Sequence, residues 1–331
     1  MSNLFTPRNL LTDVAGIAVG NSTDLRLGSG VTTIVFDQPA TASVSILGGA
    51  PGSRDTELLA PHNTVQAVDA IVLSGGSAFG LDAAGGVQAA LREQGRGLVI
   101  RDVRVPIVPQ AILFDLLNGG NKDWGRFAPY RDLGYAAAAS ASPEFELGSI
   151  GAGTGATTAT VKGGLGSASA VTSHGHTVGA IAAVNAVGSP TIGTGHHFWA
   201  APFERDAEFG GLGLPASFDA MLRLKAGRGT STTIGLVATD AVLTKAEAMR
   251  LAIMAHDGLA RAVLPAHAPN DGDTVFAAST GLRPMHHAVI ELTELGHVAA
   301  QVMARAIARG VYHATTLPVP GAQPSWRDRF G

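Results

Sequence analysis

Short apolar runs, bounded by glycine, proline and polar residues, recur along the chain in the pattern of β-strands. Seven runs have strand composition, at 31–36, 42–47, 70–73, 98–108, 167–172, 177–187 and 273–278. The Gln38-Pro39 break predicts that the first two form a hairpin. An eighth run follows Thr232, with apolar residues from Ile234 onward. The pattern weakens over 188–225, which predicts a long surface excursion.

Helical spacing predicts helices over 81–95, 133–142 and 286–312. Another begins after Thr244, which forms a capping-box pattern with Glu247, and its apolar face runs to Leu259. A β-rich middle flanked by helices with apolar faces predicts an α+β architecture of helices packed on sheets. We expect one domain over 1–331, because the segment after Thr232 is too short to fold by itself.

Composition narrows the class of protein. Of 331 residues, 46% are apolar and 15% charged, which is typical of a compact, heavily buried protein, and 43 glycines indicate tight turns. The sequence has no cysteine, which excludes disulfides, a cysteine nucleophile and cysteine-ligated metal centres. A net charge of −3 gives no electrostatic reason to expect nucleic acid or an anionic membrane as a partner.

The sequence shows neither a membrane-span pattern nor a targeting pattern. Glycines and polar residues interrupt every apolar run before it reaches the length of a span. The first nine residues have no cationic region leading into an apolar one. We therefore expect a soluble cytoplasmic protein.

Three glycine-rich loops suggest phosphate binding. Loop 48–52 lacks phosphate-loop spacing. Loop 74–80 follows a strand and precedes a helix, as anion sites do, but has neither GxGxxG spacing nor a P-loop lysine. Segment 151–156 fits GxGxxA, yet no strong strand precedes it. A non-catalytic nucleotide-binding protein is therefore an alternative interpretation, and we expect no cofactor.

The eleven histidines suggest a metal site, but their spacing gives little support. The adjacent pairs 196–197 and 286–287 would point in different directions, and no HExxH motif occurs. His174 and His176 would share one face of a strand. We expect loop or surface histidines and no metal.

The stretch around Thr232 places small hydroxyl residues directly before a strand, after a flexible loop over 225–229. A cut before Thr232 would leave a threonine as the first residue of a buried strand, with a hydroxyl and a free α-amine on one residue. That amine has a reference pKa of about 8, so near neutral pH it takes the proton of its own hydroxyl. An ordinary strand rich in serine and threonine has the same composition.

Two carboxylates and a lysine are the other candidates. Asp271 and Asp273 stand just before a strand, where a carboxylate pair would hold an ammonium group of the enzyme or of a substrate. A turn rich in Asn, Asp and Gly is the alternative interpretation. Lys162 is isolated in an apolar, glycine-rich setting, where the alternative is a solvated loop lysine.

Seven segments, taken in order, resemble the DmpA family of N-terminal-nucleophile hydrolases. The family includes L-aminopeptidase/D-esterases, β-peptidyl aminopeptidases and the nylon-oligomer hydrolase. Each segment is modest alone, but their order and joint presence over most of the chain make the resemblance specific. The segments are LGGAPGSRD (47–55), IVLSGGSAFGL (71–81), GAGTGA (151–156), KGGLGSAS (162–169), VNAVG (184–188), TTIG (232–235) and DGDTVF (271–276).

The resemblance implies a four-layer αββα sandwich of the DmpA/ornithine acetyltransferase type. It also implies a precursor that cuts itself between Ser231 and Thr232, giving chains 1–231 and 232–331. Ser231 departs from the Asn or Gly that the family often has there, but a serine is small enough for us to expect the cut. Before it, the Thr232 hydroxyl attacks the Ser231 carbonyl, and water hydrolyses the resulting ester.

The threonine and the two aspartates are similar to the nylon-hydrolase branch, because the aminopeptidase branch has a serine nucleophile and a Ser/Glu pair. Asn185 and Lys162 fall on positions that line the family site. We expect Asn185 to donate to the oxyanion, and Lys162 either to keep the Thr232 amine neutral or to contact the oxyanion. Asp271 and Asp273 would orient that amine or bind a substrate ammonium.

The activity implied is that of a self-processing amidohydrolase or aminopeptidase that acts through a Thr232 acyl-enzyme. An acyltransferase of the acetyl-ornithine type, on the related fold, is an alternative. Short peptides, β-amino-acid peptides, amino amides and ω-amino-acid oligomers all remain open as substrates. The resemblance also suggests a homotetramer.

Overall fold

The computed structural model describes residues 7–219, 221–225 and 231–331. Among these, nine strands share one hydrogen-bonded network in the order β3-β7-β4-β2-β11-β10-β9-β8, with β1 beside β2. The strands are β1 (Ile17–Asp24), β2 (Ser29–Ile46), β3 (Ser53–Arg54), β4 (Val68–Ser74), β7 (Gln110–Ile112), β8 (Leu165–Val171), β9 (Thr177–Asn185), β10 (Thr232–Ala241) and β11 (Thr274–Arg283).

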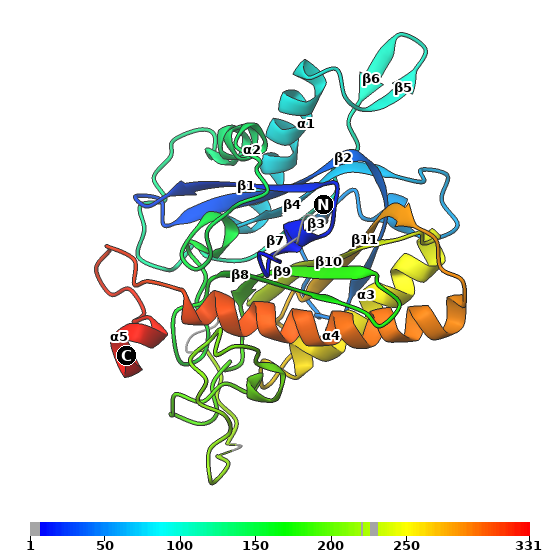
Figure 1. Ribbon diagram of the computed structural model, residues 1–331. Coiled ribbons are helices and arrows are strands. Elements are labelled where there is room, and N and C mark those ends of the chain that lie inside the picture. The colour runs from blue at the N-terminus through cyan, green and yellow to red at the C-terminus, as the bar shows by residue number, and fades with distance from the viewer. Residues whose placement is uncertain (1–6, 220, 226–230) are drawn as a thin grey trace.

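The long strand β2 divides this network into two stacked sheets. Its first half pairs with β1 and β4, and its second half pairs with β11, with a register shift between Val35 and Ala40. Apolar side chains of both sheets, such as Ile71 and Leu236, meet in a buried core between the layers. The two sheets therefore lie face to face in the middle of the molecule (Figure 1).

Helices cover the outer face of each sheet, which completes the four layers (Figure 1). Helices α1 and α2 enclose one apolar cluster against the sheet of β4, and α3 and α4 enclose another against β8 to β11. This is the predicted αββα sandwich, and its α+β class is confirmed. The helices are α1 (Ala83–Glu93), α2 (Tyr130–Ala139), α3 (Lys245–Ala260), α4 (Ala288–Tyr312) and the short α5 (Trp326–Phe330).

Two local predictions are wrong. The segments 31–36 and 42–47 are not a hairpin but halves of the single strand β2, because the chain at Gln38-Pro39 crosses from one sheet to the other instead of reversing. The strand predicted over 98–108 is a small hairpin of β5 (Leu98–Ile100) and β6 (Val103–Val105), whose apolar side chains are exposed. Composition alone does not reveal where a strand bends or turns.

The surface excursion predicted over 188–225 is only partly correct. Phe198 and Phe209 are buried, and they pack edge to face against each other within the core beneath α3 and α4. Phe198 also stacks on Trp326 of α5. The segment therefore covers one end of the sandwich, and aromatic packing replaces regular secondary structure.

The ends of three neighbouring strands, β9, β10 and β11, meet at one edge of the sheet. β10 runs parallel to β11 and antiparallel to β9, so the end of β9 meets the starts of β10 and β11. Thr232 pairs directly with Asn185, and a bridge joins Ser231 to Asp271. The sequence stretches around Thr232 and Asp271, both predicted to contain site residues, therefore lie side by side.

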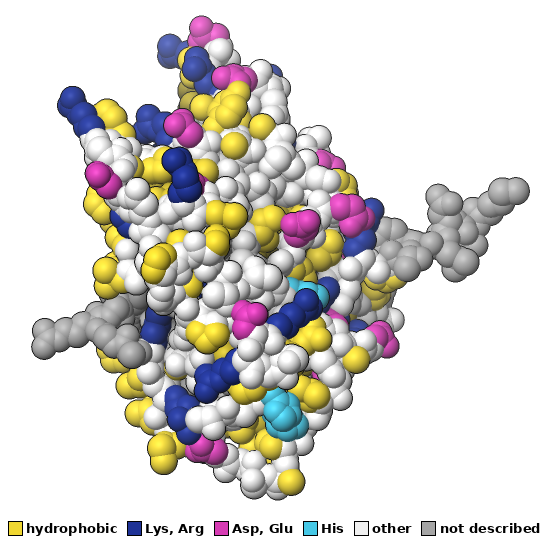
Figure 2. Space-filling view, turned by 90° about the vertical axis from the view of Figure 1, so that its left-hand side faces the viewer, with side chains coloured by type: hydrophobic (Ala, Val, Ile, Leu, Met, Phe, Trp, Pro, Cys, Tyr) yellow, Lys and Arg dark blue, Asp and Glu magenta, His cyan; other side chains and the backbone are white. Residues whose placement is uncertain are grey.

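Charged side chains of both signs are intermingled over the face seen in Figure 2. Within the described part of the chain, no helix combines the length and the hydropathy needed to cross a membrane.

Candidate active site

Thr232 is the first residue of β10 and is almost fully buried. Its Oγ1 donates a hydrogen bond of 2.5 Å to the carbonyl oxygen of Ser231, the residue before it. The same carbonyl oxygen accepts the backbone N–H of Gly272 at 2.9 Å. The peptide bond between Ser231 and Thr232 thus has a hydroxyl beside its carbonyl and a backbone donor on its oxygen.

Gly272 allows this approach because it has no side chain. A Cβ on this residue would lie 2.8 Å from Thr232 Oγ1 and 2.9 Å from the backbone oxygen of Ala50. Its backbone lies outside the left-handed region, so space rather than conformation requires a glycine here.

The two aspartates beside Gly272 have different surroundings. Both oxygens of Asp273 are hydrogen-bonded: one accepts the Thr233 N–H at 2.7 Å, and the other accepts the backbone N–H and Nδ1 of His267, each at 2.9 Å. It therefore fixes the start of β10. Asp273 is a supporting residue in this geometry.

Asp271 can still accept a further hydrogen bond. Its Oδ2 accepts the Ala268 N–H at 3.1 Å, whereas the buried Oδ1 has no hydrogen-bond partner among the described residues. The Val187 N–H lies near the carboxylate and opposes the rise in its pKa. Burial first, and then the charge of Asp273, raise the pKa of Asp271 to about 6. An ammonium group would supply the donor that Oδ1 lacks.

The Asn185 carboxamide is held from both sides. Its Oδ1 accepts Thr157 N–H at 3.0 Å and Lys225 Nζ at 2.8 Å, and its Nδ2 donates to the carbonyl of Phe114 at 2.9 Å. Among the described residues Phe114 is the one acceptor of Nδ2, so the second Nδ2 hydrogen remains available. Since Asn185 lies directly across from Thr232 in the sheet, that acceptor would be at the reacting end of β10.

Lys162 is not a solvated loop lysine. It is fully buried, and its Nζ donates to the backbone carbonyls of Gly153 and Gly163 at 3.0 Å each. Desolvation lowers its pKa to about 7; the charge of Asp115 opposes this shift, and that of Lys225 adds to it. When neutral, the amine still makes both hydrogen bonds and has a lone pair left to accept a proton.

Three residues of this region were missed by the sequence analysis. Lys225 falls at the start of the segment predicted to be a flexible loop, whose residues 226–229 lie outside the described part of the chain. Asp115 is fully buried between the Ser29 hydroxyl and Gly76 N–H, and His267 holds Asp273. Asp115 and Lys225 reach the site only through tertiary contacts, whereas His267 lies six residues before Asp273 but belongs to no recognisable motif.

The glycine loop 74–80 is occupied by the protein itself. Gly76 N–H, the donor that a phosphate would need, already binds a carboxylate oxygen of Asp115 at 2.8 Å. The GxGxxA segment forms a short 3₁₀ turn, Gly151–Gly153, in which a Cβ on Gly153 would meet the backbone of Leu165 at 2.1 Å. Both loops are glycine-rich because chain segments pack closely there, which removes the support for nucleotide binding.

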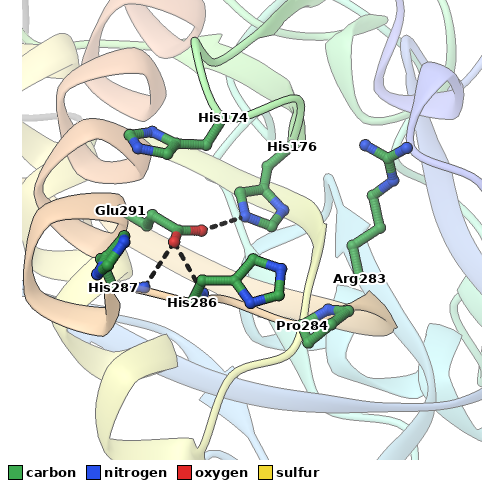
Figure 3. Close-up of a pocket in the computed structure, with 7 residues that line it drawn as sticks. All are labelled: His174, His176, Arg283, Pro284, His286, His287 and Glu291. Atoms are coloured by element: carbon green, nitrogen blue, oxygen red, sulfur yellow. Dashed lines mark hydrogen bonds and ion pairs between the residues drawn. The ribbon is translucent and has the colours of Figure 1, made fainter.

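Four histidines line a separate pocket of about 580 Å³ (Figure 3). His176 is buried there and bonds Glu291 through Nε2 at 2.7 Å, while His174 bonds Glu294 at 2.6 Å. His176 precedes the start of β9 and Asn185 ends it, so about 25 Å of strand separates this pocket from Thr232. Within the described residues, no three His, Cys, Asp or Glu side chains are arranged to hold a metal ion.

Comparison with known proteins agrees with this architecture. The model of peptidase family S58 matches residues 9–323. An uncharacterised aminopeptidase of Mycobacterium tuberculosis is 42% identical over 97% of this chain and 98% of its own length. One from Mycobacterium leprae is 38% identical over 94% and 92%.

Solved structures share the fold. A β-aminopeptidase from Burkholderia sp. has a TM-score of 0.70 and 21% identity, over 98% of this chain and 93% of that one. The L-aminopeptidase D-Ala-esterase/amidase of Ochrobactrum anthropi, described as a variant of the Ntn hydrolase fold, has a TM-score of 0.69 and 21% identity, over 99% and 94%.

These comparisons confirm the resemblance to N-terminal-nucleophile hydrolases and favour neither the acyltransferase nor the nucleotide-binding alternative. The chain belongs to peptidase family S58 and is a hydrolase of the aminopeptidase and amidase class, with the Ntn-hydrolase fold.

Proposed function

We propose that this chain cuts itself between Ser231 and Thr232, and that Thr232 then hydrolyses amide bonds of small substrates with a free amino end. One observation carries the proposal: Thr232 Oγ1 lies 2.5 Å from the carbonyl oxygen of Ser231, while Gly272 N–H donates to that same oxygen. The nucleophile and an oxyanion donor therefore already surround a single peptide bond.

Self-cleavage begins with attack of Thr232 Oγ1 on the Ser231 carbonyl carbon, while the hydroxyl proton passes to a base. We assign that role to neutral Lys162, because its loop lies against the end of β9, where Gly164 accepts the N–H of Val184 at 2.9 Å, and because its pKa is lowered to about 7. The C–N bond then breaks, and the Thr232 nitrogen takes a proton. Water hydrolyses the ester, leaving a carboxylate on Ser231 and a free α-amine on Thr232.

Gly272 N–H and Asn185 Nδ2 are the proposed donors to the oxyanion. The first already contacts the carbonyl oxygen, and the second has a free hydrogen on the residue opposite Thr232. Removal of one such donor costs about 100- to 1000-fold in rate in comparable sites.

The uncut chain also indicates where a substrate would lie. Ser231 occupies the acyl side, and its N–H donates to the backbone oxygen of Asn270 at 3.2 Å. An aminoacyl group in its place would direct its ammonium toward Asn270 and the neighbouring Asp271, whose Oδ1 lacks a donor. A free amino end is therefore the feature that we expect the site to select.

Mass spectrometry of purified protein tests the proposal. The wild type should give fragments of 231 and 100 residues, roughly 23 and 10 kDa. Thr232→Ala should stay intact and hydrolyse none of a panel of short peptides, β-peptides, amino amides and ω-amino-acid oligomers. Thr232→Ser, which keeps the hydroxyl, should still cut. An intact wild-type chain, or an active Thr232→Ala variant, would refute the proposal.

A further inference from the structure

We propose that Lys225 is a positioning residue of this site, which orients and polarises the Asn185 carboxamide for the oxyanion that forms at Thr232. The inference rests on the proposed function, and it adds a residue that lies on the segment leading to the scissile bond.

Three hydrogen bonds hold Lys225 in place. Its backbone N–H donates to the Val187 carbonyl at 2.8 Å, and its Nζ donates to Asn185 Oδ1 at 2.8 Å and to the Thr157 carbonyl at 3.2 Å. This ammonium lies inside the site, although the chain around it is mostly exposed.

The contact fixes which end of Asn185 faces the reacting group. Two donors, Lys225 Nζ and Thr157 N–H, meet Oδ1, and the Phe114 carbonyl accepts one hydrogen of Nδ2. The remaining Nδ2 hydrogen is then fixed in direction. The positive charge of Lys225 next to Oδ1 also draws electron density from the amide. This makes Nδ2–H a stronger donor to a developing negative charge.

The surrounding charges link Lys225 to the proposed base. Asp115, which follows β7, and Asp271, which precedes β11, favour the charged form of Lys225, whereas burial lowers its pKa to about 8. Lys162, which precedes β8, feels the positive charge of Lys225 as one cause of its own lowered pKa. Loss of the positive charge of Lys225 should therefore have two effects. It should make Asn185 Nδ2–H a weaker hydrogen-bond donor, and it should raise the pKa of Lys162.

Self-cleavage measures both effects without a known substrate. The full chain, purified uncut in denaturant after brief expression, is refolded at pH 6 to 10, and the two fragments are timed by intact mass. Lys225→Met should slow cleavage about 10- to 100-fold and shift its acid limb to higher pH. Lys225→Arg should restore most of the rate and move the basic limb, near pH 8 in the wild type, to higher pH, because a guanidinium stays charged.

Arg223→Met is the matched control, since Arg223 lies on the same segment but pairs with Asp219 at 2.6 Å, outside the site. It should cleave like the wild type. Equal rates and pH profiles for wild type and Lys225→Met would overturn the inference while leaving self-cleavage intact, whereas an uncut wild type would refute the proposed function instead. If Lys225→Met does not refold, the profile of Lys225→Arg decides: a basic limb unchanged from the wild type overturns the inference.

Discussion

At the scale of single residues, Asp271 and Asp273 show how burial separates two identical side chains. Asp273 has both oxygens hydrogen-bonded, so it acts as a structural anchor for β10. Asp271 has one buried oxygen without a hydrogen-bond partner in the part of the chain that the structure describes, and this is costly unless a donor arrives. The ammonium group of a bound substrate would be such a donor.

Asp271→Asn should stabilise the uncut Thr232→Ala chain at alkaline pH. Because the pKa of Asp271 rises from 3.8 to about 6 on folding, the folded state holds its proton more tightly than the unfolded state. The penalty of the buried charge therefore appears as pH rises through about 4 to 6, and removing it should gain on the order of 1–2 kcal/mol at pH 8. Denaturant unfolding at pH 8 and pH 4 measures this; a gain equal at both pH values would contradict the explanation.

Gly272→Ala should slow self-cleavage about 100-fold and also lower stability, because its Cβ would lie 2.9 Å from the backbone oxygen of Ala50. The added methyl group would lie 2.8 Å from Thr232 Oγ1, so the hydroxyl must move away from the carbonyl that it attacks. The rate of fragment appearance on a denaturing gel measures the effect. Gly85→Ala in α1 is the control, because its nearest neighbour is 3.5 Å away; a Gly272→Ala rate equal to that of this control would show that close packing at 272 is unimportant.

At the scale of elements, α3 begins as its sequence predicts. Thr244 Oγ1 accepts Glu247 N–H at 3.3 Å, and Glu247 in turn accepts Thr244 N–H at 2.8 Å, which forms the capping box. The helix packs on β11 and β2. Local and tertiary preferences agree in this element.

Thr244→Ala should lower the free energy of unfolding by about 1 kcal/mol, the usual effect of losing an N-cap. Self-cleavage should not change, because the cap contacts no site residue. Thr293→Ala, at an exposed position of α4, should change stability by less than about 0.5 kcal/mol. Urea denaturation of the two variants makes the comparison, and equal losses would show that the capping box does not stabilise α3.

At the scale of the whole molecule, the proposed cut does not divide the fold into separable parts. β10 and β11 belong to the C-terminal fragment, but β9 pairs with β10 and β2 pairs with β11. Strands of the short fragment therefore lie inside a sheet whose outer strands belong to the long one. The homotetramer suggested by resemblance remains a prediction, which light scattering would test.

After cleavage, the two fragments should stay together until the protein unfolds. Separating them would break the β9–β10 and β2–β11 pairings and expose the apolar core between the sheets. Native mass spectrometry should give a mass containing one copy of each fragment, or a multiple of it, while denaturing conditions give both separately. Independent elution of either fragment from a native sizing column would contradict this view.

The local sequence by itself predicted two elements, the strand β10 and the start of the helix α3. The β10 run after Thr232 is apolar and rich in β-favouring residues, and the Thr244 capping box needs only a turn of helix, so both were predictable. The order of seven short motifs also pointed to the family and, through it, to the αββα sandwich.

Only the tertiary structure decided which chain segments meet. β2 bends at Gln38-Pro39 because its first half pairs with β4 in one sheet and its second half pairs with β11 in the other. These partners are distant in sequence, so no local pattern predicts the bend. Lys225 reads as part of a loop, yet its ammonium bonds Asn185, which lies forty residues earlier. Hydrophobic periodicity reports which side of an element is buried, but the oxygen that a long polar side chain reaches depends on packing between distant segments.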